Sequence, residues 1–191
     1  MKKALLVSSP GQGAESLSQL LRSEGYAKVK TSFAACNARE LAEETADEFD
    51  LICVNAPLPD ENGIELSREF ADSTRSSVVI IVPQKSADDV NELLSRHGVL
   101  VISKPINKPL FRHYLQFTDC FRARMLRVEQ ENERLRNMVE DLKIIDRAKL
   151  LLVTCLNMSE SQAHKYLEKQ AMDLRTSKLD VAKQVISTYE N

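Results

Sequence analysis

The sequence predicts an α/β fold in which a doubly wound, parallel five-stranded sheet precedes a long helix and a bundle of three short helices. Five short segments expected as strands, four of them apolar runs, alternate with segments of helical periodicity in the first part of the chain, which is typical of a parallel sheet covered by helices. Residues 118–145 contain no Gly or Pro and favour one continuous helix. Three amphipathic segments then end the chain. We expect a sheet domain over residues 1–118, a connector over 119–143 and a helical domain over 144–191.

The composition is that of an ordinary globular protein. Of its 191 residues, 43% are hydrophobic and 28% are charged. No apolar run approaches the length of a membrane span, and the run after Met1-Lys2-Lys3 is too short for a signal peptide. We therefore expect a cytoplasmic protein without a membrane partner. Residues 144–191 carry nearly equal numbers of basic and acidic side chains, so any nucleic acid bound there must be recognised by shape and a few placed contacts.

No pattern of residues indicates catalysis or metal binding. The four cysteines, Cys36, Cys53, Cys120 and Cys155, are widely separated in apolar contexts, so we expect buried free thiols rather than disulfides or zinc ligands. No Ser/His/Asp or Cys/His group can be assembled from the spacing. We expect neither an enzyme nor a bound cofactor.

The first part of the chain alternates expected strands with expected helices. Strands are expected at residues 4–7, 29–33, 51–54, 78–82 and 99–102, and helices at 14–25, 37–46, 64–70 and 88–96. The third strand lies in the run D-L-I-C-V-N-A-P-L-P-D-E-N-G, and the fifth ends in Ser103-Lys104-Pro105. With Pro59 and Gly63 at the usual loop spacing, this pattern resembles the receiver domain of response regulators over residues 2–118.

The residues that carry the receiver family's chemistry are missing. In phosphorylatable receivers an acidic pair after the first strand and a phosphoacceptor Asp after the third bind Mg²⁺, and these positions here hold Ser8, Ser9 and Asn55. Hydroxyls are poor ligands for a hard cation, and a carboxamide cannot form the acyl phosphate. The Thr or Ser position after the fourth strand falls on Val82, and only Lys104 is retained. We predict a degenerate pseudo-receiver that receives its input by contact with a regulatory protein.

The connector has a heptad pattern. Its apolar positions alternate by four and three, and Asn132 fills the one missing place. A single Asn at an a position is typical of a parallel two-stranded coiled coil, in which it sets the register. The flanking charges agree, because Arg124 would face Glu129 of the partner helix. We predict a homodimer whose seam contains Phe121, Met125, Val128, Asn132, Leu135, Val139 and Leu142; the alternative is that this stripe packs within its own chain.

The last 47 residues predict three helices around one small core. Ser159 and Gln162 form a capping box between the first two helices, and Ser177 can cap the third. Apolar stripes are expected through Ala148, Leu152 and Cys155, then Ala163, Tyr166, Leu167, Ala171 and Leu174, then Leu179, Ala182, Val185 and Ile186. Together with Arg147-Ala148-Lys149, Ser159-Glu160 and Ala171-Met172, this pattern resembles the ANTAR domain. The resemblance implies binding to stem-loops in nascent transcripts, which disfavours a competing terminator.

Seven residues are candidates for RNA contact. The basic residues near the first corner and along the second helix are the first choice, and the aromatic between them could stack on a loop base. The set is Arg147, Lys149, Lys165, Tyr166 and Lys169, with Arg175 and Lys178 as secondary choices. Each lysine alone could be a solvated surface residue, and Tyr166 could be a core aromatic. The alternative function is a dimeric scaffold that binds proteins and no RNA; a DNA-binding regulator would need a basic recognition helix that is missing here.

Overall fold

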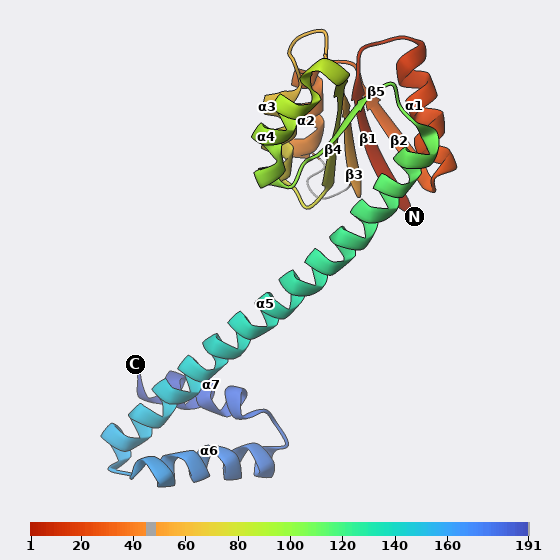
Figure 1. Ribbon diagram of the computed structural model, residues 1–191. Coiled ribbons are helices and arrows are strands. Elements are labelled where there is room, and N and C mark those ends of the chain that lie inside the picture. The colour runs from red at the N-terminus through yellow and green to blue at the C-terminus, as the bar shows by residue number, and fades with distance from the viewer. Residues whose placement is uncertain (45–48, 191) are drawn as a thin grey trace. The chain divides into compact units, whose positions relative to one another are not determined.

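The computed structural model describes residues 1–44 and 49–190 of the chain (Figure 1). They divide into two compact units, Met1–Arg124 and Met125–Asn191, each described here by itself. The elements of the first unit are β1 (Lys2–Ser8), α1 (Gln12–Ser23), β2 (Tyr26–Ser32), α2 (Ala35–Glu44), β3 (Leu51–Asn55), α3 (Ile64–Ser73), β4 (Ser77–Pro83), η1 (Gln84–Ser86), α4 (Ala87–Leu94), η2 (Ser95–His97) and β5 (Leu100–Lys104). Helix α5 (Lys108–Leu156) runs from the first unit into the second, where α6 (Glu160–Leu174) and α7 (Lys178–Tyr189) follow. The expected end of the second helix at Ala46 lies outside the described residues.

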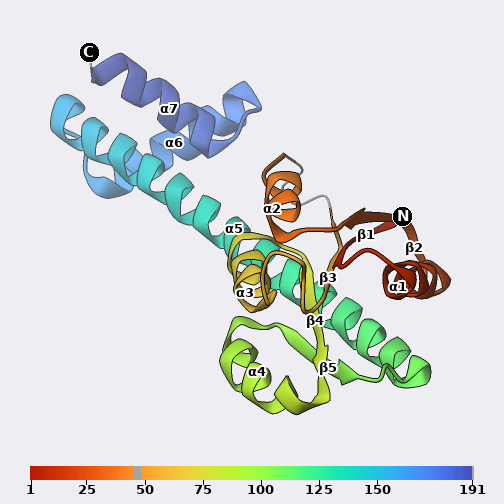
Figure 2. The same cartoon turned by 90° about the horizontal axis from the view of Figure 1, so that it is seen from above.

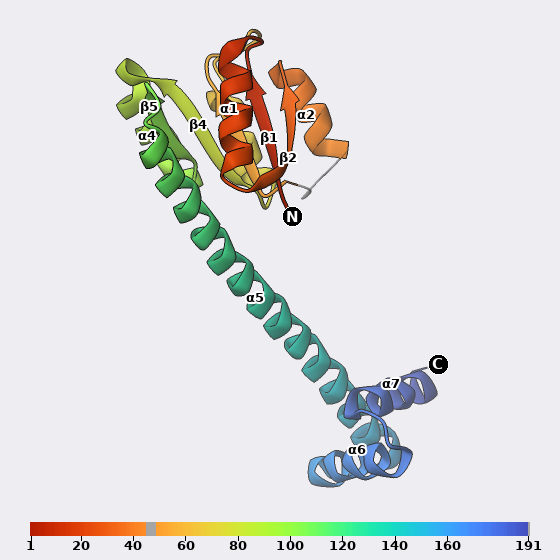
Figure 3. The same cartoon turned by 90° about the vertical axis from the view of Figure 1, so that its right-hand side faces the viewer.

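The five strands form one parallel sheet in the order β2-β1-β3-β4-β5, as the sequence predicts. Helix α1 and the first turns of α5 cover one face, and α2, α3 and α4 cover the other (Figure 2). Figure 3 shows the face of the sheet that α1 covers. Because both faces are covered, the central strands are buried along nearly their whole length, which explains why they read as continuous apolar runs.

Alternation along the strands decides which side chains can meet. Leu5, Ile52 and Val54 pack toward α2, α3 and α4. Leu6 and Cys53 pack toward α1 and α5. Since side chains alternate between faces, the strand ends Ser8 and Asn55 fall on the α1 and α5 side.

The loop after β3 has the geometry that the receiver resemblance implies. Gly63 has φ 79°, and a Cβ atom there would lie 2.9 Å from Cγ1 of Val54. Glycine is therefore required both by the backbone conformation and by the close approach. In the same loop, the Asp60 carboxylate accepts hydrogen bonds from the backbone N–H groups of Ala35 (3.0 Å) and Cys36 (3.1 Å) at the start of α2.

The heptad stripe of α5 is exposed in the chain. The six apolar seam side chains, Phe121, Met125, Val128, Leu135, Val139 and Leu142, are each between 42% and 57% exposed. Asn132, the polar residue between them, is also exposed. Burial within the chain therefore does not account for the apolar character of this stripe.

The second unit packs the last turns of α5 against α6 and α7. Its buried core consists of Ala148, Leu152, Ala163, Leu167, Val181, Ala182 and Val185. The capping box is present: the backbone N–H of Gln162 donates to Oγ of Ser159, and the backbone N–H of Ser159 donates to Oε1 of Gln162. The Ser177 side chain accepts from the backbone N–H of Asp180 and caps α7.

Several burial predictions were wrong. Cys36, Cys120 and Cys155 are exposed, and of the four cysteines only Cys53 is buried. Each exposed thiol lies on a helix, where apolar neighbours in sequence point in other directions. Leu174 is also 56% exposed, because α6 ends there and Arg175 turns the chain away in the left-handed conformation.

Candidate functional site

The receiver pocket lies at the carboxyl ends of three parallel strands. β1 ends at Ser8, β3 at Asn55 and β5 at Lys104, and in a parallel sheet these ends share one edge. Nδ2 of Asn55 donates to Oγ of Ser8 (2.9 Å), whose hydroxyl donates to the carbonyl oxygen of Ser9 (3.2 Å). Nζ of Lys104 donates to the carbonyl oxygen of Ala56 (2.7 Å). Ser8, Asn55 and Lys104 thus come together at this edge, as their positions in the sequence predict.

The pocket offers no anionic ligand to a cation. Ser8 is fully buried, and Oδ1 of Asn55 is buried without a hydrogen-bond partner among the described residues. Burial lowers the pKa of Lys104, which makes no ion pair in the part of the chain that the structure describes. Hydroxyl and amide oxygens alone do not fit Mg²⁺, which in such sites is bound through carboxylates. Within the described ranges, no group of three His, Cys, Asp or Glu side chains could hold a metal ion.

The two other residues expected at the pocket are Val82 and Ser9. Val82 packs in the cluster on the α2, α3 and α4 side, on the opposite face of the sheet from Asn55. Its assignment to the switch position stays a prediction, and Pro83, one residue on, lies on the face of Asn55. Ser9 lies outside β1, and its hydroxyl donates to the carbonyl oxygen of Pro57 (3.0 Å). Pro83, like Val82, has no hydroxyl to bind a phosphoryl group.

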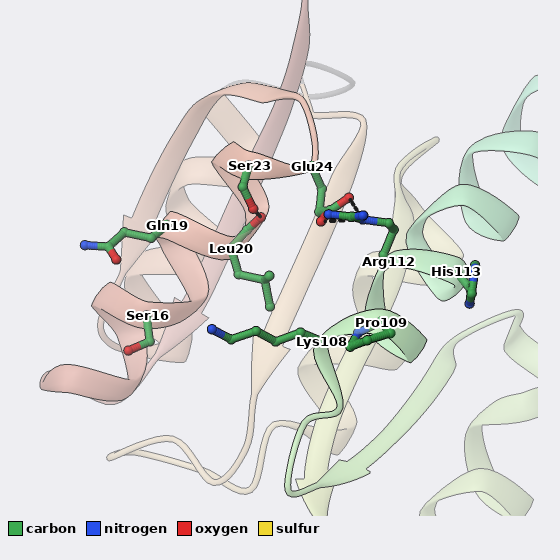
Figure 4. A pocket seen from close by; sticks show the side chains of 9 residues that line it. All are labelled: Ser16, Gln19, Leu20, Ser23, Glu24, Lys108, Pro109, Arg112 and His113. Carbon is green, nitrogen blue, oxygen red and sulfur yellow. Dashed lines mark hydrogen bonds and ion pairs between the residues drawn. The ribbon is translucent and has the colours of Figure 1, made fainter.

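A hollow of about 660 Å³ separates α1 from the start of α5 (Figure 4). Glu24 and Arg112 close one end of it, with Nε of Arg112 2.9 Å from both carboxylate oxygens. Lys108 extends toward Leu20 of α1. This hollow was not predicted, because its two walls are about 90 residues apart and the sequence carries no signal of their contact.

Three of the RNA-contact candidates gather at the corner between α5 and α6. Lys165, Tyr166 and Lys169 line a hollow of about 470 Å³ together with Leu156, Asn157, Met158 and Gln162. Both lysines are exposed and lie four residues apart, so they share one face of α6. Among the described residues, neither has a carboxylate within ion-pair distance. Tyr166 is half-buried and packs at the edge of the core, so its ring is both a core residue and part of the hollow.

Three of the other candidates form ion pairs with nearby carboxylates. Arg147 pairs with Glu190, which raises the pKa of its guanidinium. Lys149 pairs with Asp146 (2.7 Å), and Lys178 pairs with Glu168 (2.8 Å).

Arg175 ends α6 in the left-handed conformation with φ 51°. Among the described residues, the two lysines beside Tyr166 thus differ from Arg147, Lys149 and Lys178, whose charges are offset by neighbouring carboxylates.

The strand order, the covered faces and the polar residues at the strand ends define a receiver-type domain, which α5 joins to a small helical domain. Residues 10–116 match the response regulator receiver domain, and residues 133–186 match the ANTAR domain. The chain therefore belongs to the response regulators that carry an ANTAR domain. The ANTAR match begins inside the stretch expected as the connector.

Relatives extend over most of the chain. The transcriptional regulatory protein PdtaR of Mycobacterium tuberculosis is 28% identical over 172 residues, which cover 90% of this chain and 83% of that protein. Among solved structures, the signal receiver domain of an HD domain-containing protein from Pseudomonas fluorescens Pf-5 has a TM-score of 0.58 and 19% identity, covering 66% of this chain and 92% of that one. A response regulator receiver domain protein from Clostridium thermocellum has a TM-score of 0.58 and 18% identity, covering 66% and 99%. The two structures share the receiver fold alone.

No helix in the described part of the chain is long and apolar enough to cross a membrane.

Proposed function

We propose that this protein is a transcription antitermination regulator whose helical unit binds stem-loops in nascent RNA and so disfavours a terminator. The ANTAR match over residues 133–186 and the transcriptional role in the name of the PdtaR relative support this class. The observation that carries the proposal is the hollow between α5 and α6, where Lys165, Tyr166 and Lys169 lie together.

The chemistry of this hollow suits a folded RNA loop. Two lysines on one helix face can contact successive phosphates, and neither charge is offset by a carboxylate within the described residues. An unstacked loop base can pack on an aromatic ring, which places Tyr166 at the centre of the proposed site. Because the helical unit carries little net charge, affinity depends on these few contacts and on shape rather than on a basic surface.

In this proposal, the receiver-like unit is regulated without being phosphorylated. Asn55 cannot form the acyl phosphate, and its neighbour Ser8 supplies a hydroxyl where a metal-binding carboxylate would be needed. Regulation then occurs through contact with another protein, which is a role that receiver domains also have.

The active form is proposed to be a homodimer joined by α5. Its exposed apolar stripe from Phe121 to Leu142 has the spacing of a parallel coiled coil. Pairing of two stripes would bury these side chains and place two helical units on one transcript. Asn132 would then pair with its counterpart and set the register.

The test compares stem-loop RNA with duplex DNA. A pool of RNA stem-loops with randomised loops is selected on the full-length protein, and the selected RNA and a duplex DNA of equal length are then compared by fluorescence anisotropy at physiological ionic strength. The proposal expects saturable binding of the RNA and at least tenfold weaker binding of the DNA. If no stem-loop is enriched, or if both nucleic acids bind equally, RNA recognition is rejected and the dimeric scaffold becomes the better account.

A further inference from the structure

A second hollow, of about 410 Å³, lies beside the receiver pocket, between α1 and the segment that leads from β5 into α5. Its volume is in the range of small-molecule sites. Its apolar lining includes Leu17 and Leu20 of α1 and Ile106 of the connecting segment, and its polar lining includes Asn55, Lys104 and Lys108. The hollow therefore has the mixed lining of a site for a molecule with one apolar and one polar part.

The charge of this lining has one sign. Among the described residues that line the hollow, two are lysines and none is a carboxylate. Nζ of Lys104 uses one of its donors on the carbonyl oxygen of Ala56 and makes no ion pair within the described chain. Burial lowers the pKa of Lys104. This is the expected effect of burial on an amine whose charge is not stabilised by an anion among the described residues.

Lys108 adds a second cation to the lining. It also lines the larger neighbouring hollow, where its side chain extends from α5 toward α1 (Figure 4). An acceptor group within reach of both Lys104 and Lys108 would receive hydrogen bonds from two cationic donors.

We propose that this hollow binds a small amphipathic carboxylate, with its carboxylate between Lys104 and Lys108 and its apolar chain against Leu17, Leu20 and Ile106. An anion suits the lining because, among the described residues, it holds two lysines and no carboxylate. An apolar chain is required because a bare anion such as phosphate would leave the apolar walls unused. The proposal goes beyond the antitermination function, since it gives the receiver-like unit a ligand of its own.

The position of the site suits a ligand that regulates the protein. Lys108 is the first residue of α5, and the same helix continues without interruption to Leu156 in the helical unit. A ligand held by Lys108 therefore contacts the element that joins the two units, and its binding can bias that helix.

The experiment titrates hexanoate into the isotopically labelled full-length protein and follows the backbone amides of Ser16 and Lys108 by NMR. We expect saturable shifts at both amides, and binding about tenfold weaker for Lys108→Gln, because a charge-assisted contact is lost. The matched control is Lys28→Gln, which removes an exposed lysine on β2 and leaves the affinity unchanged. Unchanged affinity in Lys108→Gln would overturn the proposal.

Two aromatic variants locate the ligand. Ser16→Phe fills the hollow from its exposed α1 wall and should abolish the shifts at Lys108. Ser23→Phe occupies only the larger neighbouring hollow and should leave hexanoate binding intact. Loss of binding in Ser23→Phe but not in Ser16→Phe would place the ligand in the wrong hollow and refute the assignment. The melting temperature of each variant confirms that it is folded.

Ligand chemistry supplies the last comparison. Inorganic phosphate and 1-hexanol are titrated in the same way, and both are expected to bind at least tenfold more weakly than hexanoate. Tight binding of phosphate would mean a simple anion pocket, and equal binding of 1-hexanol would mean that the lysines contribute nothing. Either result would contradict the proposed class of ligand.

Discussion

Replacing Lys165 and Lys169 together by glutamine should weaken stem-loop binding while leaving the helical unit folded. Both side chains are exposed and lack a carboxylate partner among the described residues, so each full charge is available to a phosphate. Losing two phosphate contacts should cost on the order of 1–3 kcal/mol. Each contact contributes about 0.7 to 0.9 to the slope of log K against log salt, so the slope should fall by roughly 1.5.

The assay is fluorescence anisotropy with a selected stem-loop, repeated over a series of salt concentrations. Glutamine keeps the helix propensity of lysine and most of the length of its side chain, so a change in binding reports charge rather than folding. The matched control is Lys143→Gln with Lys183→Gln, which removes two charges from α5 and α7 outside the hollow. The affinity of this control variant for the stem-loop should change by less than about threefold, through general electrostatics alone.

Wild-type affinity and an unchanged salt slope in the Lys165 and Lys169 double variant would contradict phosphate contact by these lysines. An equal loss of affinity in the control variant would contradict it too. In either case the hollow between α5 and α6 is not the RNA surface.

Three further predictions concern other parts of the chain. Incubation with a small-molecule phosphodonor should leave the mass of the peptide containing Asn55 unchanged, and a phosphate-sized increase there would contradict the pseudo-receiver proposal. Asn132→Leu should stabilise the dimer yet allow additional oligomers, seen by analytical ultracentrifugation. A wild type that is monomeric at about 10⁻⁵ M would contradict the coiled coil. Ser159→Ala should lower the free energy of opening the first turn of α6 by about 1 kcal/mol through loss of the cap, measured by native-state hydrogen exchange. Equal protection in wild type and variant would show that the capping box contributes nothing.

The parts of the fold that depend on local sequence were predictable. The apolar runs predicted β1, β3 and β4, because a strand covered on both faces needs apolar residues throughout. Ser159 and Ser177 begin the helices that they were expected to cap, since a cap needs only residues within one turn. Gly63 was likewise recognisable from its loop pattern, which no other residue can satisfy sterically.

Two kinds of feature were not predictable from the sequence. One is the face of the sheet on which a side chain lies, and the other is contact between residues far apart in the chain. The sequence did not show on which face of the sheet Val82 lies, because a shift of one residue along a strand reverses the direction of its side chain. The sequence could not show which of the seven RNA-contact candidates form ion pairs, because the partners of Arg147 and Lys178 are 43 and 10 residues away. The hollow between α1 and α5 has no sequence signature at all, since it exists only when the two helices pack on one face.

The central claim is that this regulator holds stem-loop RNA through the hollow between α5 and α6. The most direct test crosslinks RNA to the full-length protein in native cells, purifies the complex under denaturing conditions and sequences the RNA. The claim predicts enrichment of stem-loops that lie just upstream of terminators, and loss of that enrichment when Lys165 and Lys169 are both replaced by glutamine. Recovery of the same RNA with the double variant, or of RNA without stem-loops, would contradict it.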